Sequence, residues 1–340
     1  MKKFLSITLT IGLLGGTCLG YGPRGHALVG AIADRRLAQK TTTRNKIKVL
    51  LDGLTLQRVA TIPDEIKSLD SNPNGFHLPG HRQLENELRA FVAANPKDSD
   101  ISHHQFHYTD VPVAGNEKYA SGKIGRSDFD IVQMIPFCIR VLKGQEPANN
   151  PRKITRSVAV ILLVHYLGDI HQPLHVGAEY FNAAGNPFEP TAANKGFEDQ
   201  GGNKLTLFTL VNGSPKSAGK LHGYWDSQTV NNAVANGEDF NVAKQLAIRE
   251  PADWRLSGDI ETWAEQMADE ILPIAREAHT RLKFSEIKIE PGEREITSGK
   301  ATEKKKTSGS FYAIWAAATV KDEIHKGGWR LAAILEEALQ

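Results

Sequence analysis

The stretch HYLGDIHQPLH, His165–His175, decides how this chain folds. It follows an uncharged apolar run over residues 158–164, which predicts a helix with a buried face entering the core. At about 100° per residue, His165 and Asp169 lie within about 40° of each other on one helical face. An imidazole and a carboxylate can therefore point the same way, as two metal ligands would.

The other two histidines of this stretch are predicted to differ. His171 lies about 200° round the helix from Asp169, so we expect it to point away from that pair. Pro173 cannot donate a helix hydrogen bond, so the helix should bend or end before His175, which can bring His175 back to the metal side. A single buried histidine is more often a satisfied core residue than a ligand. The metal interpretation therefore depends on a second cluster.

That second cluster is HGYWD, His222–Asp226. It repeats the histidine-to-aspartate spacing of i, i+4, which again offers imidazole and carboxylate on one helical face. These are ligand types that suit zinc. Two such clusters favour a metal site over isolated core histidines.

The first twenty residues predict a secretory signal peptide, because two lysines precede an apolar run and small residues close the segment at Gly20. Cleavage after Gly20 would leave Tyr21 as the mature N-terminus of a secreted or periplasmic protein. A lipoprotein using Cys18 ranks second, because the residues before it lack the usual large apolar side chain. The segment is too short for a membrane span, and no other stretch is long and apolar enough.

Charge and cysteine content narrow the function further. Without Lys2 and Lys3 the 41 Lys and Arg fall to 39, which balances the 39 Asp and Glu. The overall charge therefore gives no reason for electrostatic capture of nucleic acid, and any affinity for phosphate must be local. Cys138 alone remains after cleavage at Gly20, so no internal disulfide can form, and bound metal is an alternative staple.

The remaining pattern predicts one mainly helical domain over residues 21–340, with long loops and little strand. A short strand is expected at 205–211, and less regular or exposed insertions at about 68–102 and 283–310. Residues 102–112 alternate as an extended segment would, which places His103 and His107 on one side and His104 on the other. Helices are expected at 27–37, 43–51, 59–67, 83–93, 129–142, 154–170, 242–248, 260–282 and 311–339.

Separated motifs of this chain resemble the zinc-dependent single-strand nucleases of fungi, plants and bacteria, the S-one/P-one nucleases. The resemblance runs from Tyr21 to a closing GGWRLA at 327–332. It implies an all-α, phospholipase C/nuclease-type single domain with a trinuclear zinc cleft. The motifs that carry it are YGPRGH at 21–26, DEIK at 64–67, HYTD at 107–110, the stretch at 165–175 and HGYWD at 222–226.

The resemblance implies three Zn2+ ions. One ion would be held by Asp64, His107, His165 and Asp169. A second, close to the first, would be held by the amino group and carbonyl oxygen of Tyr21, by His26 and by a second oxygen of Asp169. The third would be held by His175, His222 and Asp226.

The implied reaction is hydrolysis of phosphodiesters in single-stranded DNA or RNA to 5′-phosphates, with zinc lowering the pKa of the attacking water. Activity on 3′-nucleotides is also implied. Asp110 would orient or deprotonate the water, and Lys67 would neutralise charge on the phosphoryl oxygens. Tyr108 would stack on a base, and Asn203 would lie near the substrate. No obligate protein partner is implied.

This chain departs from the family pattern in several ways, two of which bear on the metal ligands. Tyr21 stands where tryptophan is usual, and the insertion at 68–102 leaves the choice of His107 over its neighbouring histidines resting on the Tyr-x-Asp that follows. Zinc phospholipase C is an alternative, but its corresponding final carboxylate is usually Glu, where this chain has Asp226. A non-catalytic exported zinc-binding protein is a third, which Asp110 and Lys67 speak against, because neither is needed to hold metal.

Overall fold

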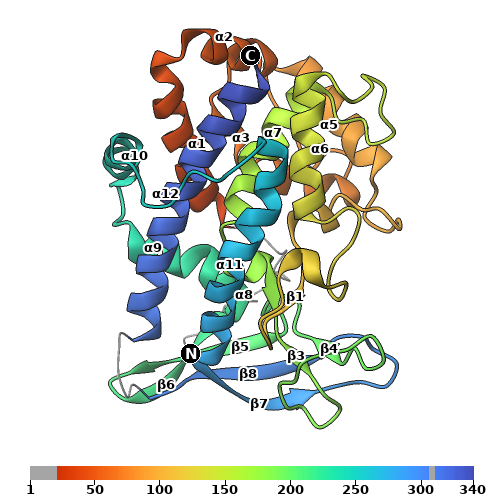
Figure 1. Ribbon diagram of the computed structural model, residues 1–340, viewed down its shortest axis with the longest axis vertical. Helices are drawn as coiled ribbons and strands as arrows, with labels where there is room; N and C mark the ends of the chain where they lie inside the picture. The colour runs from red at the N-terminus through yellow and green to blue at the C-terminus, as the bar shows by residue number, and fades with distance from the viewer. Residues whose placement is uncertain (1–20, 306–310) are drawn as a thin grey trace, which may run out of the picture.

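The computed structural model describes residues 21–305 and 311–340, which form a helical body with a small sheet across one end (Figure 1). It is about 51% helical and 12% strand, which confirms the mainly helical prediction. The predicted signal peptide lies outside the described residues. Within the described ranges, no helix combines the length and apolar character that crossing a membrane requires.

Three long stretches of loop and strand interrupt the series of helices, at residues 95–130, 170–220 and 281–305. In chain order the helices are α1 (Pro23–Arg36), α2 (Thr41–Leu50), α3 (Leu56–Val59), α4 (Ile62–Glu65), α5 (Arg82–Ala94), α6 (Ile131–Lys143), α7 (Arg156–Asp169), α8 (Leu221–Gly223), α9 (Thr229–Ala233), α10 (Asp239–Ile248), α11 (Trp263–Thr280) and α12 (Tyr312–Ala338).

Helix α7 is the centre of the body. The hydroxyl of Thr155 caps its start by accepting a hydrogen bond from Val158 N at 3.2 Å. Every residue from Val158 to Asp169 is buried, because the helix is apolar on all sides and packs against α1, α6 and α12. It ends at Asp169, and a 3₁₀ turn, η5 (Pro173–His175), follows, as the proline predicted.

Two regions before α6 differ from the prediction. The expected helix at 59–67 is divided into α3, α4 and a 3₁₀ segment, η2 (Ile66–Asp70). The extended segment expected at 102–112 is wrong for residues 103–107, because a turn leads there into the 3₁₀ segment η3 (Gln105–His107), whereas Tyr108 is extended and Val111–Pro112 form a short strand. Phe106 and His107 are both buried, so the apparent alternation came from packing of a turn and not from a strand.

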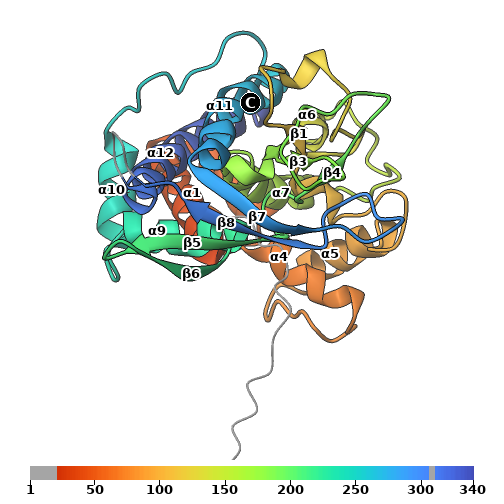
Figure 2. The same ribbon diagram turned by 90° about the horizontal axis from the view of Figure 1, so that it is seen from below.

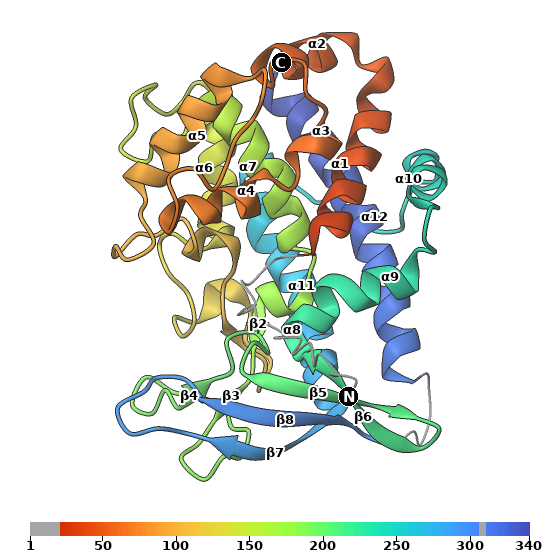
Figure 3. The ribbon, with the colours of Figure 1, turned by 180° about the vertical axis from the view of Figure 1, so that it is seen from behind.

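Most of the strand lies in a four-stranded sheet of order β6-β5-β8-β7, in which β5 and β8 are parallel and the outer pairs antiparallel. Viewed from below and from behind, the sheet crosses one end of the helical body (Figures 2 and 3). The strands are β1 (Val111–Pro112), β2 (Gly177–Ala178), β3 (Tyr180–Phe181), β4 (Phe197–Glu198), β5 (Leu205–Val211), β6 (Ser214–Lys220), β7 (Leu282–Lys288) and β8 (Ser298–Glu303).

The strand expected at 205–211 is confirmed as β5. The insertion at 283–310 supplies most of β7 and all of β8, although no strand was predicted there. The polar composition of this insertion gave no apolar alternation typical of a strand, because the buried residues of β8 are only Gly299, Ala301 and Glu303. A sheet with one face toward solvent needs no more apolar residues than that.

Candidate metal centre

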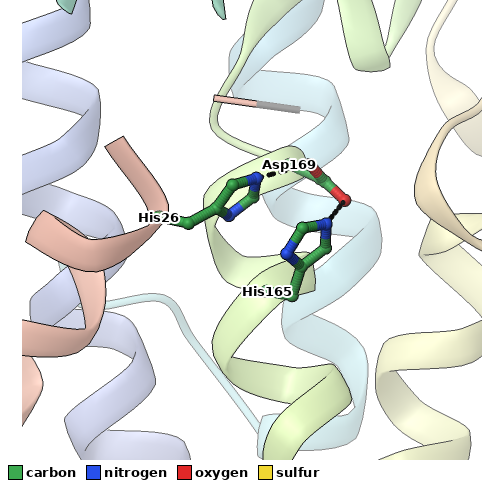
Figure 4. Close-up of side chains that lie close together, drawn as sticks. All are labelled: His26, His165 and Asp169. Carbon is green, nitrogen blue, oxygen red and sulfur yellow. Dashed lines mark ion pairs between the residues drawn. The ribbon is translucent and has the colours of Figure 1, made fainter. Parts of the chain in front are cut away.

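The first cluster joins α1 to the end of α7 (Figure 4). His26 comes from α1, and its ring stacks on that of His165, with centroids 3.7 Å apart. The Asp169 carboxylate contacts both rings, with Oδ1 3.3 Å from His26 Nε2 and Oδ2 3.2 Å from His165 Nε2. All three side chains are fully buried.

Gly168 allows this close approach of α1 to α7. A Cβ atom at that position would lie 2.5 Å from His26 Nδ1, so a larger residue would displace the imidazole. The sequence did not predict a role for this glycine, because its neighbour in space, His26, is 142 residues away along the chain. A local sequence pattern cannot indicate a contact of that kind.

The second cluster consists of Asp64, His107 and His165. His107 Nδ1 lies 3.1 Å from His165 Nε2 and 2.9 Å from Asp169 Oδ2, and Asp64 Oδ1 lies 3.7 Å from His165 Nε2. Asp169 therefore belongs to both clusters, as a bridging carboxylate would. Burial favours the neutral form of Asp64, but the Lys67 ammonium, 2.7 Å from Oδ1, and the neighbouring histidines hold its pKa well below the usual value.

The third cluster consists of His175, His222 and Asp226. The two imidazole Nε2 atoms are 3.1 Å apart, and His222 Nε2 is 3.6 Å from Asp226 Oδ2. Gln172 orients this carboxylate by donating a hydrogen bond to Asp226 Oδ1 at 2.8 Å. Gln172 was missed as a positioning residue, because its sequence signal is only its place within the stretch at 165–175.

Backbone carbonyls fix the tautomers of three of these histidines. Nδ1 donates to a carbonyl oxygen in His165, His175 and His222, at 2.7, 2.8 and 2.8 Å, respectively. Because a carbonyl can only accept, the network assigns the proton to Nδ1 and a lone pair to Nε2. The Nε2 lone pairs of His175 and His222 therefore point at each other across 3.1 Å. This arrangement is repulsive unless a cation lies between them.

The deeper cluster has the same character. Among the residues that the structure describes, both nitrogens of His26 and Oδ1 of Asp169 have no hydrogen-bond partner, although all are buried. Buried polar atoms of this kind are costly unless a ligand satisfies them. The donor set, imidazole nitrogen and carboxylate oxygen, fits zinc.

Electrostatics keep most of these histidines neutral, as ligands must be. Burial lowers the pKa of His26 and His107, and lowers that of His175 to about 3. For His165, burial also opposes the charged form, but the carboxylates of Asp169 and Asp64 raise its pKa above the usual value. These carboxylates therefore favour a positive charge beside His165 Nε2, which a bound metal ion would supply.

The predicted substrate residues lie in one cleft of about 590 Å³. The short parallel pair β1-β2 and the hydrogen bond from Thr109 N to His175 O, at 2.8 Å, bring the two metal-facing segments together. Lys97, Lys204 and Lys220 also line the cleft, and no motif in the sequence predicted them. Of the predicted site residues, the cleft is lined by Lys67, His107, Tyr108, Asp110, His175, Asn203, His222 and Asp226.

The remaining predicted ligands lie outside the cleft lining. His26, Asp64, His165 and Asp169 form the two deeper clusters. Tyr21 is fully buried, and its hydroxyl donates to His171 O at 2.6 Å. The amide of Gly22 donates to Asp226 O at 2.8 Å, which holds the start of α1 beside the third cluster.

His171 lies on the opposite side of the α7 end, as predicted. Its Nδ1 donates to Leu167 O at 2.7 Å, and its Nε2 accepts a hydrogen bond from Arg330 at 3.0 Å. Burial and the nearby Arg330 charge hold the pKa of His171 well below its usual value. Both ring nitrogens are thus used in packing, which leaves none for a metal.

Comparison with known proteins gives consistent matches. The family model described as S1/P1 Nuclease matches residues 21–340. The chain is similar to Endonuclease 3 of Arabidopsis thaliana, with 24% identity over 97% of this chain and 92% of that protein. It is also similar to Endonuclease 5 of the same plant, with 24% identity, over 58% of this chain and 56% of that protein's length. Endonuclease 4 gives the same identity and the same coverage.

Proposed function

We propose, from the premise that this chain belongs to the S1/P1 nuclease family, that it is an exported zinc-dependent endonuclease for single-stranded DNA and RNA. Its products would be 5′-phosphates, and it would also act on 3′-nucleotides. The observation that carries this proposal is the set of Nε2 lone pairs that converge beside a cleft containing Lys67, Tyr108 and Asp110.

Three zinc ions would be held by the residues of the three clusters. His26 and Asp169, with the main chain of Tyr21, would hold one, and Asp64, His107 and His165 its neighbour, with Asp169 shared. His175, His222 and Asp226 would hold the third. When bound, zinc supplies a lowered pKa for water and positive charge for the phosphate oxygens.

Asp110 is proposed to orient the attacking water and to accept its proton. Its backbone is fixed on both sides, because Asp110 N donates to Gly125 O at 2.8 Å and Asp110 O accepts from the Tyr180 hydroxyl at 2.8 Å. The residue is 8% exposed and lines the cleft. A carboxylate on a rigid backbone beside the metal ligand His107 can hold a water in line with phosphorus.

Lys67 is proposed to stabilise the charge that develops on the phosphoryl oxygens. Its ammonium contacts Asp64, and its side chain is 7% exposed while lining the cleft. This partial burial strengthens its electrostatic effect on a bound phosphate. Because the phosphoryl charge grows toward the transition state, the contribution of Lys67 should appear mainly in kcat.

Tyr108 is proposed to select single strands. It lies in extended backbone directly after η3, half-buried in the cleft, where a ring can stack on an unpaired base. Every base has a face for stacking, and a duplex hides that face. Asn203, whose Nδ2 donates to Gln200 O at 3.0 Å, is proposed to lie near the same base.

Export is proposed on the basis of the signal-like residues before Tyr21. Cleavage after Gly20 would create the amino group that the family's second zinc requires. The isolated Cys138 is buried, so folding outside the cell would depend on metal and packing instead of on a disulfide.

The test is a substrate panel with the processed protein. Single-stranded DNA, RNA, duplex DNA, a 3′-nucleotide and phosphatidylcholine are incubated with and without chelator, and zinc is added back. We expect chelator-sensitive cleavage of the single strands and release of phosphate from the 3′-nucleotide. Preferential release of phosphocholine would support the phospholipase alternative, and zinc binding without any turnover would support a non-catalytic role.

A further inference from the structure

A fourth group of metal-ligand side chains lies beside the three clusters already described. It consists of Asp70, at the end of η2, and the adjacent residues His103 and His104. His103 Nε2 and His104 Nε2 both point to one oxygen, Asp70 Oδ2, at 3.1 and 2.7 Å. The three residues are not among those that the family resemblance implies.

The group is held in place by its backbone. His103 N donates to Asn95 O at 3.0 Å, and the Asn95 side chain is itself tied to Phe91 O at 2.7 Å. His104 N donates to the hydroxyl of Ser102 at 3.2 Å. Both imidazoles are thus pre-positioned toward the carboxylate, which lowers the cost of forming a coordination site.

The two imidazoles differ in exposure, as the ligands at the mouth of an open metal site would. The His103 side chain is 1% exposed, the Asp70 side chain 10%, and the His104 side chain 31%. His104 also lines the cleft together with Lys67 and Lys97. A cation held by the group would therefore have protein on one side and the cleft on the other.

We propose that Asp70, His103 and His104 bind a fourth divalent transition-metal ion of the zinc class. Two imidazole nitrogens and one carboxylate oxygen form a three-ligand set, which leaves a position for water or a phosphate oxygen from the cleft.

The competing interpretation is a network without metal, in which both histidines donate from Nε2 to Asp70. It satisfies the carboxylate, and in both interpretations the buried His103 Nδ1 has no partner among the described residues. The charge of Lys67 opposes a cation here, but its ammonium is bound to Asp64 at 2.7 Å. The two interpretations differ in one measurable quantity, the number of metal ions that each chain binds.

The test uses the processed protein, freed of metal and dialysed to equilibrium against Co2+. The variants are Asp70→Asn, which keeps size but removes charge, and His104→Ala, which removes the most exposed ligand. The matched control is His81→Ala, because His81 contacts a single carboxylate, Asp52, at 2.9 Å and has no third ligand in the described chain. Melting curves verify that each variant is folded.

We expect wild type and His81→Ala to bind one more equivalent of Co2+ than Asp70→Asn and His104→Ala. Anomalous scattering from crystals grown with Co2+ should show the extra ion among the three ligand atoms. Equal Co2+ content in all four folded proteins would overturn the proposal, whether the ion is missing from wild type or bound elsewhere. Because the count is independent of hydrolysis, it does not depend on the proposed nuclease activity.

Discussion

The two sides of the α7 end use the same residue types for opposite purposes. On one side, Asp169 and its histidines bring nitrogen and oxygen atoms together, and in the described part of the chain both His26 nitrogens and Asp169 Oδ1 are buried without a hydrogen-bond partner. On the other side, His171 donates to Leu167 O and accepts from Arg330. The first side is incomplete without a cation, whereas the second is complete as it stands. Complementarity of donors and acceptors therefore distinguishes a metal ligand from a packing histidine better than burial does.

The His171 side is a structural junction. The fully buried Arg330 donates to His171 Nε2, to Trp254 O at 2.7 Å and to Glu270 Oε2 at 2.6 Å. These contacts tie α12 to α11 and to the end of α7. Because a buried guanidinium that loses an acceptor is left uncompensated, this side should respond to mutation through stability.

The largest expected effect is that of Asp169→Asn. The amide keeps the size of the side chain but removes the charge that would bridge two zinc ions. We expect hydrolysis to fall on the order of 10³-fold, equivalent to about 4 kcal/mol of transition-state stabilisation. The metal content should also fall by one or two ions per chain, measured by atomic absorption on protein that a melting curve shows to be folded.

His171→Ala is the matched change on the opposite side. It should lower the free energy of unfolding by about 3 kcal/mol, because Arg330 loses an acceptor and a cavity forms. The zinc content of the folded fraction should match that of wild type. Its kcat should stay within about tenfold of wild type, as expected for a residue that acts indirectly. Similar losses of kcat in the two folded variants would show that the two sides are not functionally distinct.

The next effect tests whether the chain start belongs to the metal side. Keeping Gly20, or adding a methionine before Tyr21, converts the α-amino group of Tyr21 to an amide, which is a poor zinc ligand. An α-amino group with a pKa near about 8 can lose its proton to zinc at neutral pH. We expect the extended protein to lose about one zinc ion and most of its hydrolysis.

Tyr21→Phe in correctly processed protein is the control for that experiment. It removes only the hydroxyl that donates to His171 O, so stability should fall by about 1 kcal/mol while zinc content is unchanged. Full zinc content and full activity in a verified extended protein would show that the amino group of Tyr21 is not a ligand.

The sequence predicted those parts of the site that depend on neighbouring residues, and missed those that depend on residues far apart in the chain. The spacing of His165 and Asp169, and the turn at Pro173, predicted which side chains share a side, because helical periodicity and proline geometry are local. Gly168 and Gln172 were missed because their roles depend on contacts with His26 and Asp226. Those contacts exist only after packing.

The same distinction explains the fold. The expected helices at 129–142 and 154–170 correspond to α6 and α7, because an apolar run of helical length is sufficient evidence for each. Strands β7 and β8 were missed, because their pairing with each other and with β5 is non-local and one face is polar. The 3₁₀ turn at Gln105–His107 was predicted as part of an extended segment for a related reason. A stretch of two or three residues fits the period of a strand and the period of a helix equally well.

A smaller effect separates two residues of the metal side that contact substrate in our proposal. Lys67→Ala should lower kcat about 10²-fold, because its contact strengthens as phosphoryl charge develops. Tyr108→Ala should raise KM for oligonucleotides and 3′-nucleotides by a factor equivalent to roughly 1 to 3 kcal/mol, with little change in kcat. Steady-state kinetics with zinc content verified would distinguish the roles, and the reverse assignment of kcat and KM effects would exchange them.

The smallest expected effect concerns Glu179, a buried carboxyl group whose charge is stabilised by one histidine, His279, whereas several histidines surround Asp169. Burial raises its pKa to about 7, while His279 partly opposes the shift. A folded-state pKa above the unfolded value means that the stabilising contribution is complete below the unfolded pKa, about 4.5, and is lost as pH rises through 7.

Glu179→Gln cannot ionise, so it should exceed wild type in free energy of unfolding by about 1 to 2 kcal/mol at pH 8, with the difference shrinking toward pH 5.5. Urea unfolding of the zinc-loaded proteins across this range measures the effect. A pH-independent difference between Glu179→Gln and wild type would mean that Glu179 stays ionised in the folded protein. The ionisation of Glu179 would then be the same as that of the carboxylates on the metal side, and burial alone would not distinguish them.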